Sequence, residues 1–544
     1  MQRQEPAMTT VINNALNEED YDTAWEECSK GLIAYPTNPT LWYNRSVIDY
    51  LKGFPELAIM DAIRSLKLLE DEVNKSNDEF ELLTIKNFII KCLDLIGKSM
   101  GDVGSYEKGT EMYEKAIRTF DETIENYKEK IMMDEDFNTG SPINAKLTKL
   151  ENEINLEYFQ EQKKTYQKEL DYKVELMKTK YPTLNESFIK TFMVNVSFKF
   201  NGSYPWDKPI SNNNELQYHN YIADELRNVD HITLSSINYE RDIEISENIK
   251  YQQLAIVAKR NILKGEIIFQ EIAFVSVHES SSLKCDYCHV PLNHSSKITC
   301  ENSSCSDIFC TKSCNNLALQ LNHSPLCGNI LYYSFKNKLY NLLQIGVINN
   351  IVYFEILLML KLFSIAKTRD VCPLDIQEIK YLSRFNRQIS SSNVNINNKI
   401  NQKEIEFPER IFELYQDILE ILQISIHDLQ YDFWIFLTIW SIIKSNLIQL
   451  NPTFQNEVVG IFTVSGLLNH SCTNANVKVR NFGLGLSETK LGYGIIIETT
   501  MDIMKDQELF LSYCDMSKIP KDRKKSYLLR YFGFECRCSD CQQY

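Results

Sequence analysis

Eight potential metal ligands lie close together between residues 284 and 328. Cysteine thiolates and histidine nitrogens at short spacing are typical of tetrahedral zinc sites, and eight ligands are enough for two ions. A segment this short cannot fold on a core of its own, so metal is expected to hold it together. The candidate ligands are Cys285, Cys288, Cys300, Cys305, Cys310, Cys314, His323 and Cys327.

The ligand spacing suits zinc. Cys285 and Cys288 form a C-x2-C knuckle, and His323 and Cys327 are four residues apart, as on one face of a helix. The alternative is a set of buried or oxidised cysteines. His289 and His294 are expected to be surface residues rather than ligands.

A third site is predicted near the C-terminus. Three closely spaced thiols there lack a fourth ligand, which Cys472 in the segment NHSC could supply. Such a four-thiolate site would pin the tail against that segment, whereas the alternative is four unrelated thiols. The predicted set is Cys472, Cys536, Cys538 and Cys541, so about three zinc ions per chain are expected.

The first cluster resembles the MYND zinc finger, in which two zinc ions are held in a cross-braced pattern. The gap of four residues between Cys300 and Cys305 departs from the two usual in that family. MYND fingers bind proteins, often Pro-rich peptides, rather than catalyse. The resemblance assigns Cys285, Cys288, Cys310 and Cys314 to one ion and Cys300, Cys305, His323 and Cys327 to the other.

The C-terminal motifs resemble the SET domain of protein lysine methyltransferases. GLLNHSC is followed by ELFLSY and then by C-x-C-x2-C, and upstream IVAKRNILKGEIIFQE resembles the opening β-hairpin, with Lys264 and Gly265 at its turn. A SET core interrupted by a MYND finger after this hairpin is the architecture of the SET-and-MYND (SMYD) family. The resemblance covers about residues 240–544 and rests on the order of the motifs.

The resemblance implies a binding site for S-adenosylmethionine. Asn469 and His470 would hold the adenosyl part, and Asn446 in IKSNLIQL stands where family members place another cofactor-binding Asn. Phe532 and Phe534 in FGFEC resemble the aromatic pair against which adenine packs, although the family commonly has Tyr where Phe532 stands.

Tyr513 is the predicted catalytic residue. Methyl transfer to lysine is a displacement at a sulfonium methyl group, which needs a neutral amine, a straight approach and a narrow channel that excludes water. A Tyr hydroxyl can align the amine without acting as a strong base, since its ordinary pKa is about 10. The alternative for Tyr513 is a packing role at a strand end.

One segment departs from the family. SET enzymes usually carry a Gly-x-Gly loop whose backbone closes on the methionine part of the cofactor, and glycine permits such close approach. By register, that loop falls at Gln253, Leu254 and Ala255, so neither glycine is present. This loss favours an alternative function, a catalytically weak or inactive SET-MYND scaffold that binds partner proteins.

Composition limits the remaining functions. The chain has 544 residues, and 58 Lys and Arg against 73 Asp and Glu give a net charge of −15. Such an acidic chain is a poor binder of nucleic acid, because counterion release rewards a positive surface. No secretory signal or membrane span is visible, and 15 cysteines, an odd number, favour metal sites in a reducing compartment. We therefore expect cytoplasmic and/or nuclear localisation.

The N-terminal part is expected to be a tetratricopeptide-like (TPR-like) array. Ala24 and Ala58 are 34 residues apart, and Pro36 falls where the second helix of a repeat would end. Gly109 takes the equivalent position in a third copy, 51 residues after Ala58, so an insertion is expected near residues 70–80. The alternative is a plain helical bundle.

Residues 143–178 predict a charge-dense helix packed on one side, since apolar residues recur there at steps of three and four. Residues 201–215 are read as a linker, and residues 386–404 as a polar surface insertion. The apolar runs at 345–366 and 433–443 are read as buried helices.

The predicted fold class is α+β multidomain. The layout is TPR-like repeats at 1–130, a helical connector and linker at 131–235, the first part of the SET domain at 236–280, the MYND finger at 281–330, a helical SET insertion at 331–445, the SET catalytic core at 446–520 and a post-SET zinc-binding tail at 521–544.

The sequence thus predicts an enzyme that transfers a methyl group from S-adenosylmethionine to a lysine of a histone or another protein. Its partners would be that protein substrate and proteins recruited by the finger and the repeats. No membrane and no direct nucleic-acid contact are expected.

Overall fold

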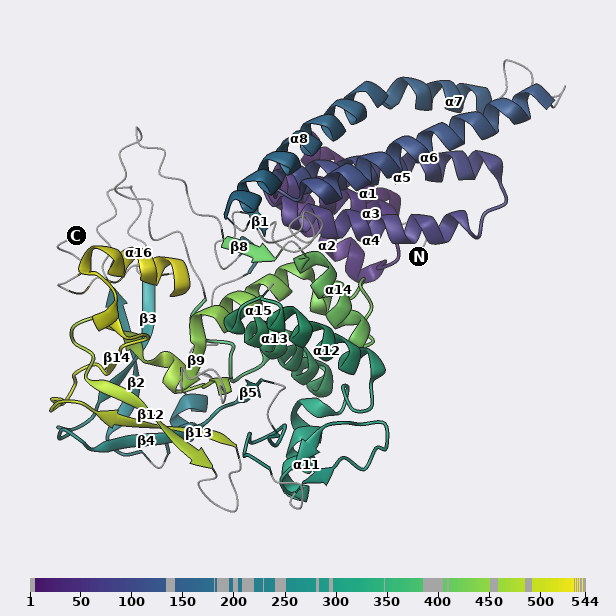
Figure 1. Cartoon of the computed structure of the whole chain (residues 1–544). Helices are drawn as coiled ribbons and strands as arrows, with labels where there is room; N and C mark the ends of the chain where they lie inside the picture. The colour runs from purple at the N-terminus through teal and green to yellow at the C-terminus, as the bar shows by residue number, and fades with distance from the viewer. Residues whose placement is uncertain are drawn as a thin grey trace. The chain divides into compact units, whose positions relative to one another are not determined.

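The computed structural model describes two compact units. Helices come first along the chain and a β-rich region follows (Figure 1). The first unit comprises residues 1–199, 402–416 and 425–433, and the second comprises residues 200–401, 417–424 and 434–544. The residues described are 5–133, 142–180, 182, 195–198, 204–207, 220–227, 229–239, 251–279, 283–292, 297–346, 348–384, 405–408, 410–450, 458–484, 492–532, 534, 536, 538 and 541.

Consecutive helices of the first unit pack against each other from α1 to α6, and α8 packs against α6. A two-stranded antiparallel sheet, β1 with β8, the short helix η4 (Leu429–Tyr431) and the first part of α14 (Ile411–Ile421) also belong to this unit. Their bounds are α1 Glu5–Asn17, α2 Tyr21–Ala34, α3 Pro39–Leu51, α4 Pro55–Val73, α5 Glu79–Asp102, α6 Tyr106–Met133, α7 Pro142–Glu153, α8 Leu156–Lys180, β1 Asn195–Phe198 and β8 Ile405–Pro408.

Local sequence signals explain where these helices begin. The side chains of Asp20 and Asn38 accept hydrogen bonds from backbone N–H groups in the first turns of α2 and α3. α3 and α4 each carry a proline in the first turn, where its missing N–H costs nothing. Ala24 and Ala58 are fully buried, and a Cβ at Gly109 would lie 2.9 Å from the Tyr166 ring. The small residues of the predicted repeats therefore lie where helices approach closely.

The insertion predicted near residues 70–80 is only partly correct in its location, because most of the additional residues lie in α5. α4 has 19 residues against 14 in α2, and α5 has 24 against 13 in α3. Only residues 74–78 separate α4 from α5. The additional residues lengthen two helices, because helical apolar periodicity continues through α5 instead of ending in a loop.

The single helix predicted over residues 143–178 is two helices, α7 and α8. The break lies at Ile154 and Asn155, where the Asn155 side chain accepts a hydrogen bond from the backbone N–H of Tyr158 and so caps α8. Leu147 and Leu150 are buried, as the predicted one-sided packing requires.

Residues 402–416 and 425–433 group with the first unit rather than with the helical SET insertion to which the sequence assigned them. Asp432 forms buried ion pairs with Arg45 and Arg64, and the Arg64 side chain donates a hydrogen bond to Tyr415. These contacts join residues that are more than 350 positions apart in the sequence. The local sequence therefore gives no sign that this segment groups with the first unit.

The second unit is β-rich. Its largest sheet has the order β11-β14-β12-β13-β4, and β5-β10-β9, β2-β3 and β6-β7 form smaller sheets. The strands are β2 Ile232–Tyr239, β3 Tyr251–Ala258, β4 Ile267–Ile272, β5 Val275–His278, β6 Ile298–Thr299, β7 Ile308–Phe309, β9 Leu447–Leu450, β10 Val458–Ile461, β11 Asn469–His470, β12 Val477–Leu484, β13 Tyr493–Thr499 and β14 Phe510–Leu511.

The helices of this region follow the predicted buried runs closely. α13 and α15 are lined by buried apolar side chains. α14 and α15 are divided between the two units, and η4 lies in the first. The bounds are α11 Lys312–Ala318, η1 Leu319–His323, α12 Ile330–Gln344, α13 Asn350–Arg369, η2 Pro373–Asp375, α14 Ile411–Ile421, η4 Leu429–Tyr431, α15 Phe433–Asn446, η5 Ser465–Leu467, η6 Met516–Lys518 and α16 Lys521–Phe532.

The opening β-hairpin predicted around Lys264 and Gly265 is only partly correct. A turn does lie there, and Gly265 has a φ of 84°, which suits glycine. However, β3 pairs with β2 and β4 pairs with β13. Bridges from Val257 to Glu508 and from Ile262 to Ile503 join the end of β3 and the chain after it to residues 503–508. β3 and β4 therefore do not pair with each other.

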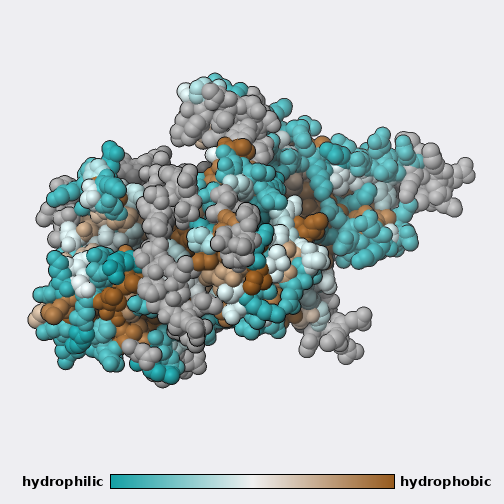
Figure 2. Space-filling view, turned by 60° about the horizontal axis from the view of Figure 1, so that its bottom comes forward, coloured by the Kyte–Doolittle hydropathy of each residue, from teal (hydrophilic) through white to brown (hydrophobic). Residues whose placement is uncertain are grey.

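The surface is mostly hydrophilic on the face drawn in Figure 2, with apolar residues confined to patches. Among the described helices, none has the length and apolar character needed to cross a bilayer. Residues 386–404 and most of 201–215 lie outside the described residues, so the predictions for them stay predictions.

Candidate functional site

Three groups of four potential ligands come together in the second unit. Within each group, the ligand atoms all lie within 4.8 Å of one another. The groups are Cys285, Cys288, Cys310 and Cys314; Cys300, Cys305, His323 and Cys327; and Cys472, Cys536, Cys538 and Cys541. These groups are the three ligand sets predicted from the sequence. The first two alternate along the chain, as the predicted cross-braced pattern requires. Soft thiolates and imidazole at this spacing fit tetrahedral zinc, which stays a prediction.

Tight turns position the first group. The backbone N–H of His289 donates to the Cys285 carbonyl, which closes the knuckle. On the other side, Thr311 caps α11, and its hydroxyl accepts a hydrogen bond from the backbone N–H of Cys314 at 3.1 Å. The Sγ atoms of Cys288 and Cys310 are 3.5 Å apart, so the two knuckles face each other.

The second group includes Cys305 despite its unusual spacing from Cys300. The Sγ of Cys305 lies 3.5 Å from Nε2 of His323, and the Tyr333 hydroxyl donates to the same sulfur at 3.0 Å. His323 and Cys327 do not share a regular α-helix face, as the spacing suggested. His323 ends the π-helical turn η1, and Cys327 follows in a turn, which still brings both toward Cys300.

The third group joins distant parts of the chain. Cys472 Sγ lies 3.6 Å from the Sγ atoms of Cys536 and Cys541. A metal ion at this point would tie the C-terminal segment to the chain that follows β11. The site therefore depends on thiols that the sequence separates by more than 60 residues.

His289 does not lie at the surface, contrary to the sequence prediction, and it belongs to none of the three ligand groups. Only 5% of it is exposed, and its Nε2 lies 2.8 Å from the Ser276 hydroxyl. The rings of His278 and Tyr493 lie at its edges. This packing explains its burial, which the sequence could not indicate. His294 lies outside the described residues.

Tyr513 lies in a cluster of rings. Its centroid is 5.1 Å from that of His470, 5.5 Å from Phe532 and 5.8 Å from Phe534. Its hydroxyl donates to the backbone carbonyl of Leu468 at 2.8 Å. Burial raises the pKa of Tyr513 well above its usual range, so the hydroxyl stays protonated at neutral pH.

Strand pairing places His470 beside Tyr513. β11 runs parallel to β14, with Asn469 opposite Phe510 and His470 opposite Leu511. The backbone N–H of Tyr513 donates to Nδ1 of His470 at 3.1 Å, which fixes the plane of the imidazole. Burial lowers the pKa of His470 to about 4, so the ring is neutral at physiological pH.

The two predicted asparagines are both buried and already hydrogen-bonded. The Asn469 amide donates to the Leu254 carbonyl at 3.2 Å and to the Glu508 carboxylate at 2.7 Å. The Asn446 amide donates to the carbonyls of Ser383 and Ile442, at 2.6 and 2.7 Å. In this state, each Asn uses both amide hydrogens within the protein.

The segment that replaces the Gly-x-Gly loop is part of strand β3. Gln253, Leu254 and Ala255 pair with β2 in regular antiparallel register, and Ala255 is fully buried. The backbone is therefore extended, a conformation that any residue adopts. Since Leu254 accepts the hydrogen bond from Asn469, this strand does lie beside the predicted cofactor residues.

Sequence reasoning missed two carboxylates that hold the site. Glu271 on β4 accepts hydrogen bonds from the backbone N–H groups of Val464 and Ser465, both at 2.8 Å, and so fixes the turn before Asn469. Asp307 contacts His323 in the finger. A carboxylate within the apolar run of β4 was the available signal for Glu271, and an acidic residue between candidate zinc ligands was the signal for Asp307.

Comparisons with known proteins identify one domain. The family model of the SET domain matches residues 253–514. A solved structure entitled "Crystal structure of MamA protein" matches with 14% identity over 34% of this chain and 99% of that chain, at a TM-score of 0.14, which is too low to support an argument. No curated protein matches. The chain therefore contains a SET domain, at residues 253–514, of the kind found in protein lysine methyltransferases.

Proposed function

We propose that this chain is a protein-lysine N-methyltransferase that uses S-adenosylmethionine. One observation carries the proposal beyond the domain match. Tyr513 and His470, within the SET match, meet Phe532 and Phe534, from the segment that follows it, in one aromatic cluster beside the third cysteine group. Such a cluster offers flat apolar faces to a purine and a water-poor setting for methyl transfer.

The chain's own residues would orient the reaction. S-adenosylmethionine supplies an electrophilic sulfonium methyl group when bound. The protonated Tyr513 hydroxyl and the Leu468 carbonyl that it contacts offer polar atoms at a buried position, where they can align a neutral amine. The His470 ring supports Tyr513, because its Nδ1 accepts a hydrogen bond from the backbone N–H of Tyr513.

The residues present fit the cofactor in part. Phe532 and Phe534 are only partly buried, so their faces remain accessible for ring packing. The amide hydrogens of Asn469 and Asn446 are engaged within the protein. Cofactor binding through the amide hydrogens would require the contact of Asn469 with Leu254 or Glu508 to open.

This engaged Asn469 favours a second candidate function. A SET-and-MYND scaffold of weak or absent activity would bind partners through the finger and the helical unit. The closed β3 strand at Gln253, Leu254 and Ala255 supports it, because the strand takes the place of a flexible glycine loop.

Calorimetry distinguishes the two functions. S-adenosylmethionine titrated into the zinc-loaded full chain should bind at one site, and Phe534→Ala should weaken that binding because an adenine face is lost. Phe335→Ala on α12 is the matched control and should leave affinity unchanged. An absence of saturable binding at high cofactor concentration supports the scaffold and contradicts the enzyme.

We further propose the finer assignments that accompany this function. Residues 281–330 would be a MYND finger, residues 521–544 a post-SET zinc-binding tail and residues 1–130 TPR-like repeats that recruit partner proteins. Fifteen free thiols support a reducing compartment, so we propose the cytoplasm or the nucleus.

A further inference from the structure

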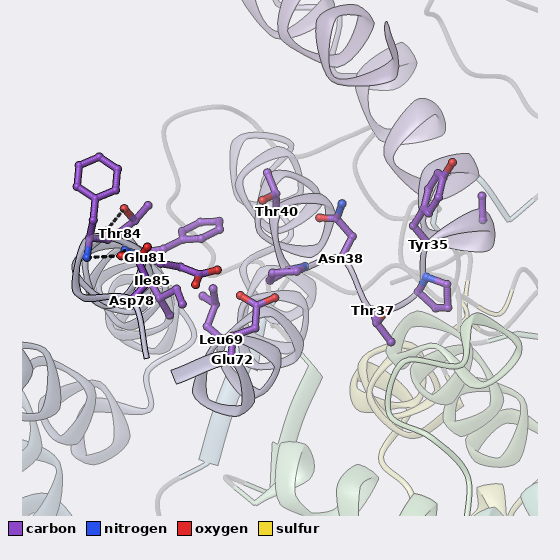
Figure 3. A pocket seen from close by; sticks show the side chains of 15 residues that line it. Tyr35, Thr37, Asn38, Thr40, Leu69, Glu72, Asp78, Glu81, Thr84 and Ile85 are labelled. Atoms are coloured by element: carbon purple, nitrogen blue, oxygen red, sulfur yellow. Dashed lines mark hydrogen bonds between the residues drawn. The ribbon is translucent and has the colours of Figure 1, made fainter. Parts of the chain in front are cut away.

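The first unit contains an open groove that the proposed catalytic function does not use. Its volume is about 870 Å³, within the size range of protein ligand pockets. One wall is the α2–α3 connection, residues 34–40, and the other is formed by the end of α4 and the start of α5. Figure 3 shows Glu72 and Glu81 together on the second wall, with Tyr35 and Asn38 on the first.

The groove is acidic. Glu72, Asp78 and Glu81 line it, and no Lys or Arg does. Among the described residues, no ion pair involves any of these three carboxylates. By contrast, Glu70, which lies on α4 with Glu72, pairs with Lys115 at 2.6 Å. Asp78 accepts the N–H groups of Phe80 and Glu81, and Glu81 accepts the Ser76 hydroxyl, so neutral donors are their partners here.

The negative charges are close enough to affect one another. Burial raises the pKa of Glu72, and the charge of Glu81 raises it further, while Lys75 only partly opposes the shift. A cation placed between the two carboxylates would relieve this repulsion. The groove therefore has an electrostatic preference for positively charged groups.

Apolar side chains lie next to these charges. Phe80 is 42% exposed at the rim, which is high for so large an apolar residue. Leu69 and Ile85 are buried at the floor, and the Phe88 ring packs edge-on against Tyr43 at 5.0 Å. A ligand that carries only charge would leave the exposed Phe80 ring in water, so the groove fits a ligand that is both cationic and apolar.

The arrangement does not suit a metal ion. The three carboxylates do not form a group whose oxygens all lie within 4.8 Å of one another, unlike the three cysteine groups. Positive charges spaced along an extended chain would match them better than a single ion.

We propose that this groove binds a peptide segment in which basic residues alternate with apolar ones. The basic side chains would contact Glu72 and Glu81, and the apolar side chains would pack on Phe80 and Phe88. The occupant is thus a protein partner with an exposed basic-apolar stretch. This inference rests on the proposed partner-binding role of the helical unit and does not require methyl transfer.

Fluorescence anisotropy with the full chain tests the proposal. The probe is a fluorescein-labelled peptide of alternating arginine and leucine, in which arginine avoids the lysine site of a SET domain. Glu72→Gln combined with Glu81→Gln should weaken binding about tenfold at low ionic strength, because two attractive charges are lost. Phe80→Ala should also weaken it.

The matched control is Glu157→Gln combined with Glu161→Gln, which removes two exposed charges from α8, outside the groove. It should change affinity by less than about twofold, since exposed distant charges are screened. Lack of saturable binding, an equal loss in both double variants, or equal binding of a glutamate-leucine peptide would overturn the proposal. Titration of S-adenosylmethionine into the same preparation reports separately on the proposed enzyme.

Discussion

Asp307 illustrates how a single side chain can orient a metal ligand. Its Oδ2 lies 3.3 Å from Nδ1 of His323, so Nε2 of that imidazole faces Cys305. Lys336 lies 3.7 Å from Oδ1 of Asp307 and 3.5 Å from Asp286, and Asp307 itself is only 4% exposed. A buried carboxylate on the second nitrogen fixes the tautomer and orientation that a zinc ligand needs.

We therefore predict that Asp307→Asn weakens zinc binding at the second group by about 10- to 100-fold. Metal analysis should find about three zinc ions per wild-type chain, and competition with a chelator should remove one ion earlier from the variant. Glu301→Gln is the control, because Glu301 is 80% exposed on the same finger and pairs only with Lys312. Identical zinc loss from Asp307→Asn and the control would contradict this role.

At the scale of single residues, the sequence predicted which candidate ligands come together but not the side chains that hold them in place. Local spacing alone groups most of the cysteines, because a tight turn or a short helix brings near neighbours to one ion. The roles of Asp307, Glu271 and Glu508 depend on contacts with residues far along the chain or on another strand. The burial of His289 is likewise decided by Ser276, on a neighbouring strand.

The helices of the first unit are tied to a later segment by a buried charge network. Arg45 and Arg64 share Asp61 and Asp432, at nitrogen–oxygen distances of 2.5 to 2.9 Å. All four side chains are at most 4% exposed. Burial and the negative charge of Asp61 raise the pKa of nearby Asp49 well above its ordinary value, whereas Asp61 and Asp432 pair directly with the two arginines.

Asp432→Asn should lower the free energy of unfolding by about 3–5 kcal/mol, because it leaves a buried arginine charge uncompensated. Urea denaturation followed by circular dichroism measures this change. Asp22→Asn removes a carboxylate that is 80% exposed and pairs with Lys52, so it should cost less than about 1 kcal/mol. Equal stability of the two variants would show that the network does not hold the segment.

The sequence predicted helices best where a single local pattern, such as an apolar run, determines them. The buried helices α13 and α15 follow from continuous apolar runs, and α2 ends before Pro36 as the repeat pattern requires. Strand partners were missed, because β3 and β4 flank one turn and yet pair with β2 and β13. Strand pairing depends on competition among distant strands, which periodicity does not report.

For the whole molecule, the domain match identifies the type of domain, and the net charge bears on the kind of partner. The SET match spans residues 253–514 and so includes the first two groups of candidate metal ligands. The division into two units cuts across that range, since residues 402–416 and 425–433 belong to the helical unit. A net charge of −15 indicates attraction to basic proteins, in line with a lysine-bearing substrate and with the acidic groove.

The most direct test of the account is transfer of a labelled methyl group from S-adenosylmethionine to protein lysines in a cell lysate. The zinc-loaded full chain should label lysine side chains, which mass spectrometry can locate. Tyr513→Phe should reduce labelling by about tenfold or more, with zinc content and melting unchanged, because only the aligning hydroxyl is lost. No labelling by the wild-type chain, or equal labelling by Tyr513→Phe, would contradict the assignment of Tyr513 as the catalytic residue of a lysine methyltransferase.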